Sequence, residues 1–133
     1  MARLVPDQGG LPRVIIADDE PTVLDVTRRL ARSLGWQSLL ADSAQQAALL
    51  LREYGANVDC VLLDLHMPGA EGLACLRELR DAAPGVRIVV MTGDQESASL
   101  AATGETRPDA VLVKPFNSCE LDEALSGRRA EAA

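Results

Sequence analysis

The sequence of 133 residues is poor in several residue types, and each shortage argues against a class of protein. Aromatic residues make up only 2%, so the chain has few platforms on which bases or sugars could stack. The 13 basic residues are outnumbered by 20 acidic ones, and the net charge of −7 opposes binding to phosphate backbones or anionic membranes. No apolar run approaches the roughly 18 residues of a membrane span, and the first residues are too polar for a signal peptide. We therefore expect neither direct nucleic acid binding nor membrane insertion.

Cysteine and lysine are also scarce. Cys60, Cys75 and Cys119 are odd in number, and their spacing matches no zinc or redox motif. We expect them to be reduced, small hydrophobic residues of a cytoplasmic protein. Of the basic residues only one is a lysine, Lys114, which suggests that this position needs lysine for its chemistry.

The remaining composition is that of one globular domain, with 47% apolar and 25% charged residues. We expect a flexible N-terminal lead or linker over residues 1–12. A single domain follows over residues 13–126, and residues 127–133 form a tail.

Short apolar runs alternate with helical patterns along this domain. Continuous aliphatic runs are typical of parallel strands covered on both faces. They occur at residues 14–17, 60–63, 88–91 and 110–113, with a weaker run at 37–41. Five strands alternating with helices predict an α/β fold with a doubly wound parallel sheet in the order 2-1-3-4-5 and helices on both faces.

The helices are expected between these runs. The first, from Pro21 to Leu34, is expected to bury Val23, Val26, Leu30 and Leu34, with Gly35 just beyond its end. The second follows Ser43 as a cap and ends at Gly55. Others are expected over 71–83 and over 95–102. A last helix is expected after Asn117 and Ser118, the two candidates for its cap, and carries Leu121 and Leu125. Trp36, at the start of the second strand, is expected to pack in the core.

Polar side chains follow the strong strands. Asp18 and Asp19 follow the first, Asp64 the third, Thr92 the fourth and Lys114 the fifth. Because parallel strands end at one edge of the sheet, we expect these side chains to meet there. Grouped carboxylates attract a hard cation such as Mg²⁺, and with a hydroxyl and an ammonium they describe a phosphoryl site in which Asp64 is the nucleophile.

These motifs resemble the receiver domain of bacterial two-component response regulators. The resemblance is carried by VIIADDEP at 14–21, VLLDLHMPG at 61–69, VMTG at 90–93 and VKPF at 113–116. It spans about residues 13–126 and implies a flavodoxin-like receiver fold. It also implies a cytoplasmic signalling switch rather than an enzyme.

The resemblance also implies roles for the site residues. Asp64 would accept a phosphoryl group from a histidine kinase or histidine phosphotransfer protein. Asp18, Asp19, Asp64 and the backbone carbonyl of His66 would bind Mg²⁺ or Mn²⁺. Thr92 and Lys114 would contact the phosphoryl group, and the Lys114–Pro115 peptide bond would be cis. The side chains of His66 and Asp94 would affect the lifetime of the phosphoryl group modestly. The resemblance also leaves open a homodimer of this chain.

Two segments depart from the family pattern. Val111 stands where the family usually has Tyr or Phe, which puts the usual aromatic switch in doubt. The stretch before the fifth strand has few large apolar residues, so we expect a short or mobile fourth helix.

The departure at Val111 leaves a phosphorylation-independent interaction scaffold as an alternative function. An aspartate-based phosphatase is a weaker alternative, because such enzymes place a second Asp two residues after the nucleophile, where this sequence has His66. A nucleotide or flavin binder is disfavoured by the acidic residues after the first strand.

Overall fold

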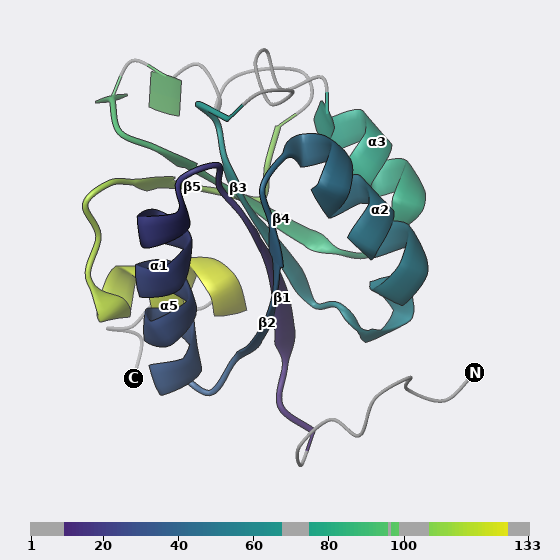
Figure 1. Ribbon diagram of the computed structural model, residues 1–133, viewed down its shortest axis with the longest axis horizontal. Coiled ribbons are helices and arrows are strands. Elements are labelled where there is room, and N and C mark those ends of the chain that lie inside the picture. The colour runs from purple at the N-terminus through teal and green to yellow at the C-terminus, as the bar shows by residue number, and fades with distance from the viewer. Residues whose placement is uncertain (1–9, 68–74, 96, 99–106, 128–133) are drawn as a thin grey trace.

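The computed structural model describes residues 10–67, 75–95, 97–98 and 107–127. Its strands are β1 (Arg13–Ala17), β2 (Gln37–Ala41), β3 (Cys60–Asp64), β4 (Arg87–Thr92) and β5 (Ala110–Val113). Its helices are α1 (Pro21–Ser33), α2 (Ala44–Tyr54), α3 (Cys75–Ala82) and α5 (Ser118–Ser126), with a short 3₁₀ helix η1 at Gly55–Asn57. The strands form one parallel sheet in the order β2-β1-β3-β4-β5, with α1 and α5 on one face and α2 and α3 on the other (Figure 1). The predicted fold class is confirmed.

Alternation along the strands divides the core into two layers. In β1, Ile15 packs toward α2 and α3, whereas Val14 and Ile16 pack toward α1 and α5. β3 and β4 alternate in the same way, because successive strand residues point to opposite faces. All five residues of β1 and of β3 are buried, as expected for strands covered on both faces.

The ends of the helices match the capping residues in the sequence. The Ser43 hydroxyl accepts a hydrogen bond from the Gln46 backbone N–H at 3.0 Å and begins α2. Gly35 follows α1 with a φ of +91°, a conformation that favours glycine. The Asn117 side chain begins α5 through a capping box with Glu120. Trp36 is buried in the α1 and α5 layer, as predicted.

The buried face of α1 differs from the predicted one. Val26 is 59% exposed, and the fully buried residues of the helix are Thr27 and Ala31. Leu30 and Leu34 do pack against the core, as does Leu24. The buried face is therefore rotated relative to the predicted stripe and centres on Thr27 and Ala31.

None of the three cysteines forms a disulfide, as predicted. Cys60 and Cys75 are buried, whereas Cys119 is exposed. Burial raises the pKa of the Cys60 thiol to about 12. Cys119 lies two residues before the buried Leu121 on α5, so at 3.6 residues per turn it points to the opposite side of the helix.

Several predictions fall outside the described residues. They concern most of the lead at 1–12, the tail beyond Gly127, the start of the third helix and most of the fourth helix at 95–102. Within the described part of the chain, no helix has the length and apolar character needed to cross a membrane. The Lys114–Pro115 peptide bond is cis, as the resemblance implied.

Candidate functional site

Three carboxylates meet where β1 and β3 end. Asp18 directly follows β1, and Asp64 is the last residue of β3, which pairs with β1. Asp18 is fully buried and Asp64 is 3% exposed, whereas Asp19 is exposed. One carboxylate oxygen from each lies within 4.8 Å of the others. The cluster therefore has two oxygen donors fixed inside the protein and a third at its mouth.

Lys114 is the cation beside this cluster. It follows β5, and its Nζ donates to Asp18 Oδ2 at 3.2 Å and lies 3.7 Å from Asp64 Oδ2. Its backbone N–H donates to the Thr92 carbonyl at 2.7 Å, which holds the start of the loop against β4. The ammonium thus bridges two buried carboxylates and partly offsets their mutual repulsion.

The electrostatic balance at Asp64 still disfavours its ionised form. Burial raises the pKa of Asp64 above its ordinary value, and the neighbouring Asp18 acts in the same direction. The His66 backbone N–H, which donates to Asp64 Oδ1 at 3.1 Å, and the Lys114 ammonium lower it again. The ionised form of Asp64 is stabilised by any positive charge placed near it, so the electrostatics favour the binding of a cation at the cluster.

Asp18 is oriented by backbone as well as by Lys114. Its Oδ1 accepts from the Glu20 backbone N–H at 3.0 Å, and its own backbone N–H donates to the Ala41 carbonyl at 3.1 Å. These hydrogen bonds fix the first turn after β1 and provide partners for the buried polar atoms of Asp18.

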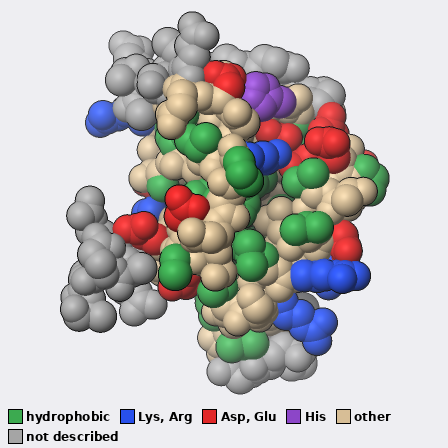
Figure 2. All heavy atoms as spheres, turned by 90° about the vertical axis from the view of Figure 1, so that its left-hand side faces the viewer, with side chains coloured by type: hydrophobic (Ala, Val, Ile, Leu, Met, Phe, Trp, Pro, Cys, Tyr) green, Lys and Arg blue, Asp and Glu red, His purple; other side chains and the backbone are tan. Residues whose placement is uncertain are grey.

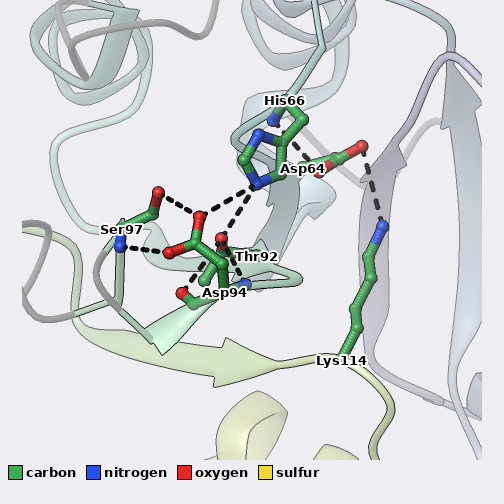
Figure 3. Close-up of polar contacts among 6 residues, drawn as sticks. All are labelled: Asp64, His66, Thr92, Asp94, Ser97 and Lys114. Atoms are coloured by element: carbon green, nitrogen blue, oxygen red, sulfur yellow. Dashed lines mark hydrogen bonds and ion pairs between the residues drawn. The ribbon is translucent and has the colours of Figure 1, made fainter.

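Thr92 and His66 form the other side of the site, as Figure 3 shows. Thr92 ends β4 and is fully buried. Its Oγ1 lies 3.0 Å from the Nε2 of His66, which reaches it from the loop after β3. In Figure 2 the single histidine lies at the surface next to acidic side chains. Thr92 also contacts Asp94, whose carboxylate accepts from the backbone N–H of Ser97.

The strand-end residues predicted from sequence lie at one edge of the sheet. Asp18, Asp19, Asp64 and Lys114 form the acidic cluster and its cation, and Thr92 joins Asp64 through His66. The contact between His66 and Thr92 was missed by the sequence reasoning. The predicted order of the sheet contained the signal for it, because β3 and β4 are neighbours and the residues that follow them must lie close together.

Val111 occupies the position at which the sequence departs from the family pattern. It lies in β5, is partly buried, and packs against the layer that α2 and α3 cover. In this position it contributes aliphatic packing and carries no hydroxyl or ring.

The donor set suits a hard divalent cation. Carboxylate oxygens are the ligands that Mg²⁺ prefers, and a site with one exposed carboxylate leaves room for the waters that this ion retains. The nearby ammonium and hydroxyl are donors that could bind the oxygens of a phosphoryl group. The arrangement is therefore chemically suited to phosphoryl transfer to a carboxylate.

Comparisons with known proteins give a consistent result. Residues 14–126 match the family described as the response regulator receiver domain. The transcriptional regulatory protein AruR of Pseudomonas aeruginosa is 34% identical over 114 residues, which are 84% of this chain and 46% of AruR. The chain thus spans about half the length of this relative.

Solved structures agree. A response regulator receiver domain protein from Clostridium thermocellum superposes with a TM-score of 0.78 and 28% identity, covering 88% of this chain and 93% of that one. A response regulator from Burkholderia pseudomallei, solved with a phosphorylated aspartic acid and a calcium ion, superposes on this chain with a TM-score of 0.72 and 26% identity. The superposed residues are 86% of this chain and 66% of the Burkholderia chain.

Proposed function

Because the chain belongs to the receiver domain family of two-component response regulators, whose members are phosphoacceptors, we propose that Asp64 is its phosphoacceptor. The observation that carries the proposal is the position of Asp64 at the end of β3, beside the Asp18 carboxylate and with the Lys114 ammonium 3.7 Å from its Oδ2. Phosphorylation of Asp64 would then be the event that switches the domain between signalling states.

The transfer step follows from the chemistry of a carboxylate. A carboxylate oxygen of Asp64 attacks the phosphorus of a phosphohistidine, the new O–P bond forms, and the P–N bond breaks. The imidazole of the donor leaves and takes up a proton. Lys114 stabilises the negative charge on the phosphoryl oxygens, and the Thr92 hydroxyl donates a hydrogen bond to one of them.

Receiver domains bind Mg²⁺ at an acidic pocket, and the cluster of Asp18, Asp19 and Asp64 fits that group. We assign these three carboxylates and the backbone carbonyl of His66 as the ligands of Mg²⁺ or Mn²⁺ in this chain. When bound, the ion supplies positive charge that counters the repulsion between the carboxylates and the incoming phosphoryl group.

The remaining features of the proposal rest on family membership. The phosphodonor is a histidine kinase or a histidine phosphotransfer protein, and the domain assists its own phosphorylation without being an enzyme in the ordinary sense. A cytoplasmic location, a domain spanning residues 13–126 and the absence of direct nucleic acid binding complete the proposal.

Intact mass after incubation with Mg²⁺ and acetyl phosphate tests this function. We expect the mass of one phosphoryl group to be added, and we expect no addition without Mg²⁺ or in Asp64→Asn. The matched control is Asp59→Asn, which changes an exposed aspartate at the other end of β3 and should leave the gain intact.

Three other results would contradict the proposed function. Phosphorylation that persists in Asp64→Asn would place the acceptor elsewhere. The absence of phosphorylation with acetyl phosphate and with a phosphorylated histidine phosphotransfer protein would favour the interaction scaffold. Steady release of phosphate from a phosphomonoester would favour the phosphatase.

A further inference from the structure

His66 contacts both residues on which the proposed switch depends. Its backbone N–H donates to Asp64 Oδ1 at 3.1 Å, and its imidazole Nε2 lies 3.0 Å from Thr92 Oγ1 (Figure 3). The side chain is 54% exposed, so packing alone does not hold the ring in place. Among the described residues, the shortest polar contact of the ring is the one with Thr92.

The hydroxyl of Thr92 has one proton to donate. Its hydrogen-bonding neighbours include His66 Nε2 at 3.0 Å and the Asp94 carbonyl at 3.5 Å. The Asp94 backbone N–H donates to the same hydroxyl oxygen at 3.3 Å. Which atom donates in the contact between His66 and Thr92 depends on the imidazole tautomer. With the ring proton on Nδ1, Nε2 receives the Thr92 proton and is a nearer acceptor than the Asp94 carbonyl.

The Asp94 carboxylate is a weaker partner for the imidazole. Asp94 Oδ2 lies 3.9 Å from Nε2, which is beyond hydrogen-bond length. The same carboxylate accepts from the Ser97 backbone N–H at 2.9 Å and from the Ser97 hydroxyl at 2.6 Å. Of these two contacts of the ring, only the one with Thr92 has hydrogen-bond length.

A phosphoryl group on Asp64 would compete for this proton. Its oxygens are strong acceptors, and the Thr92 hydroxyl cannot donate to one of them while it donates to His66. We propose that the His66 imidazole, with its ring proton on Nδ1, is a positioning residue that accepts the Thr92 hydroxyl proton in the unphosphorylated protein and must release it on phosphorylation. This inference rests on the proposed function. It means that the His66 imidazole lowers the stability of the phosphorylated state relative to the unphosphorylated state.

Removal of the imidazole should therefore favour the phosphorylated state. The probe is beryllofluoride, which mimics a phosphoryl group on a carboxylate, added with Mg²⁺ and followed by isothermal titration calorimetry. We expect His66→Leu to bind it more tightly, by roughly two- to tenfold, which is the range that the loss of one competing hydrogen bond allows. His66→Gln keeps a hydrogen-bonding side chain and should restore affinity close to that of the unsubstituted chain.

A double-mutant cycle separates this role from a general effect of the substitution. Thr92→Val removes the hydroxyl and retains the shape of the side chain. In the Thr92→Val background, His66→Leu should change beryllofluoride affinity by less than about 1.5-fold, because no hydroxyl remains for which to compete.

The possible outcomes distinguish a failure of the inference about His66 from a failure of the proposed function. If the unsubstituted chain bound no beryllofluoride in the presence of Mg²⁺, the proposed function would fail and this inference with it. If it bound, but His66→Leu had the same effect with and without the Thr92 hydroxyl, only the role of His66 would be overturned. Weaker binding by His66→Leu would also overturn it, because the imidazole would then assist the phosphorylated state.

Discussion

At the scale of single residues, Asp64 shows how a reactive position carries a cost in stability. Its carboxylate is almost fully buried, lies beside a second buried carboxylate, and has its pKa raised mainly by burial. A raised pKa means that the folded protein holds the proton more tightly than the unfolded chain does. Ionisation of Asp64 therefore destabilises the folded state once the pH exceeds the ordinary pKa of aspartate.

We predict that Asp64→Asn stabilises the metal-free protein at pH 7. The expected rise in Tm is roughly 2–5 °C, because removing one unfavourable buried charge is worth about 1 kcal/mol in a domain of this size. Thermal unfolding followed by circular dichroism measures it. The advantage of the variant should grow as the pH rises from the ordinary pKa of aspartate through the raised pKa of Asp64, and it should vanish in acid.

The matched control for this prediction is Asp19→Asn. Asp19 belongs to the same cluster but is exposed, so its charge is solvated and the variant should change Tm less. A fall in Tm for Asp64→Asn, or an equal rise for both variants, would contradict the explanation from burial.

At the scale of elements, α5 depends on its cap and on two leucines. The Asn117 side chain accepts from the Glu120 backbone N–H at 2.8 Å, and the Glu120 carboxylate accepts from the Asn117 backbone N–H at 2.9 Å. Leu121 and Leu125 then bury one side of the helix against the sheet. The helix is short, so tertiary packing and capping stabilise it more than intrinsic propensity does.

We predict that Asn117→Ala lowers the free energy of unfolding by about 1 kcal/mol, the usual cost of losing an N-cap side chain. Chemical denaturation at a fixed Mg²⁺ concentration measures the change. Ser118→Ala is the matched control, because Ser118 is the exposed neighbour and is not the cap. Equal effects of the two substitutions would show that the capping box does not stabilise α5.

Helix α1 shows that the buried residues of a helix are not always its most hydrophobic ones. Thr27 and Ala31 are buried while Val26 is exposed, although valine is the more hydrophobic side chain. The inner face of α1 thus has small side chains at its most buried positions. Hydrophobicity alone therefore ranks these positions in the wrong order.

At the scale of the whole molecule, the parallel sheet gathers residues that are distant along the chain. Lys114 and Asp18 are separated by 96 positions and form an ion pair at 3.2 Å. The cluster that results is acidic in a protein with a net charge of −7, so a divalent cation is attracted by both the local and the overall charge.

We predict that Mg²⁺ stabilises the whole fold by binding at this cluster. At a concentration tenfold above its measured Kd, the linkage relation gives about 1.4 kcal/mol of added stability. The measurement is Tm against Mg²⁺ concentration at constant ionic strength. Asp18→Asn should weaken the response, whereas Glu53→Gln, an exposed change near the end of α2, should leave it unaltered. An equal response in all three proteins would indicate general screening of charge instead.

The local features of this protein were determined by the sequence alone. The aliphatic runs specify five strands, of which β1, β3 and most of β4 are buried, and Ser43, Gly35 and Asn117 mark the ends of helices, because both effects depend on residues close along the chain. The order of the sheet followed from the alternation of strands and helices, and with it the prediction that the strand-end residues share one edge.

Only the tertiary structure decided how those residues meet. Lys114 lies closer to Asp18 than to Asp64, and the His66 imidazole contacts Thr92 across two neighbouring strands. The inner face of α1 also differs from the stripe that the sequence predicts. The physical reason is the same in each case: these contacts depend on the register between strands and on the distance at which a helix packs, which no short stretch of sequence encodes.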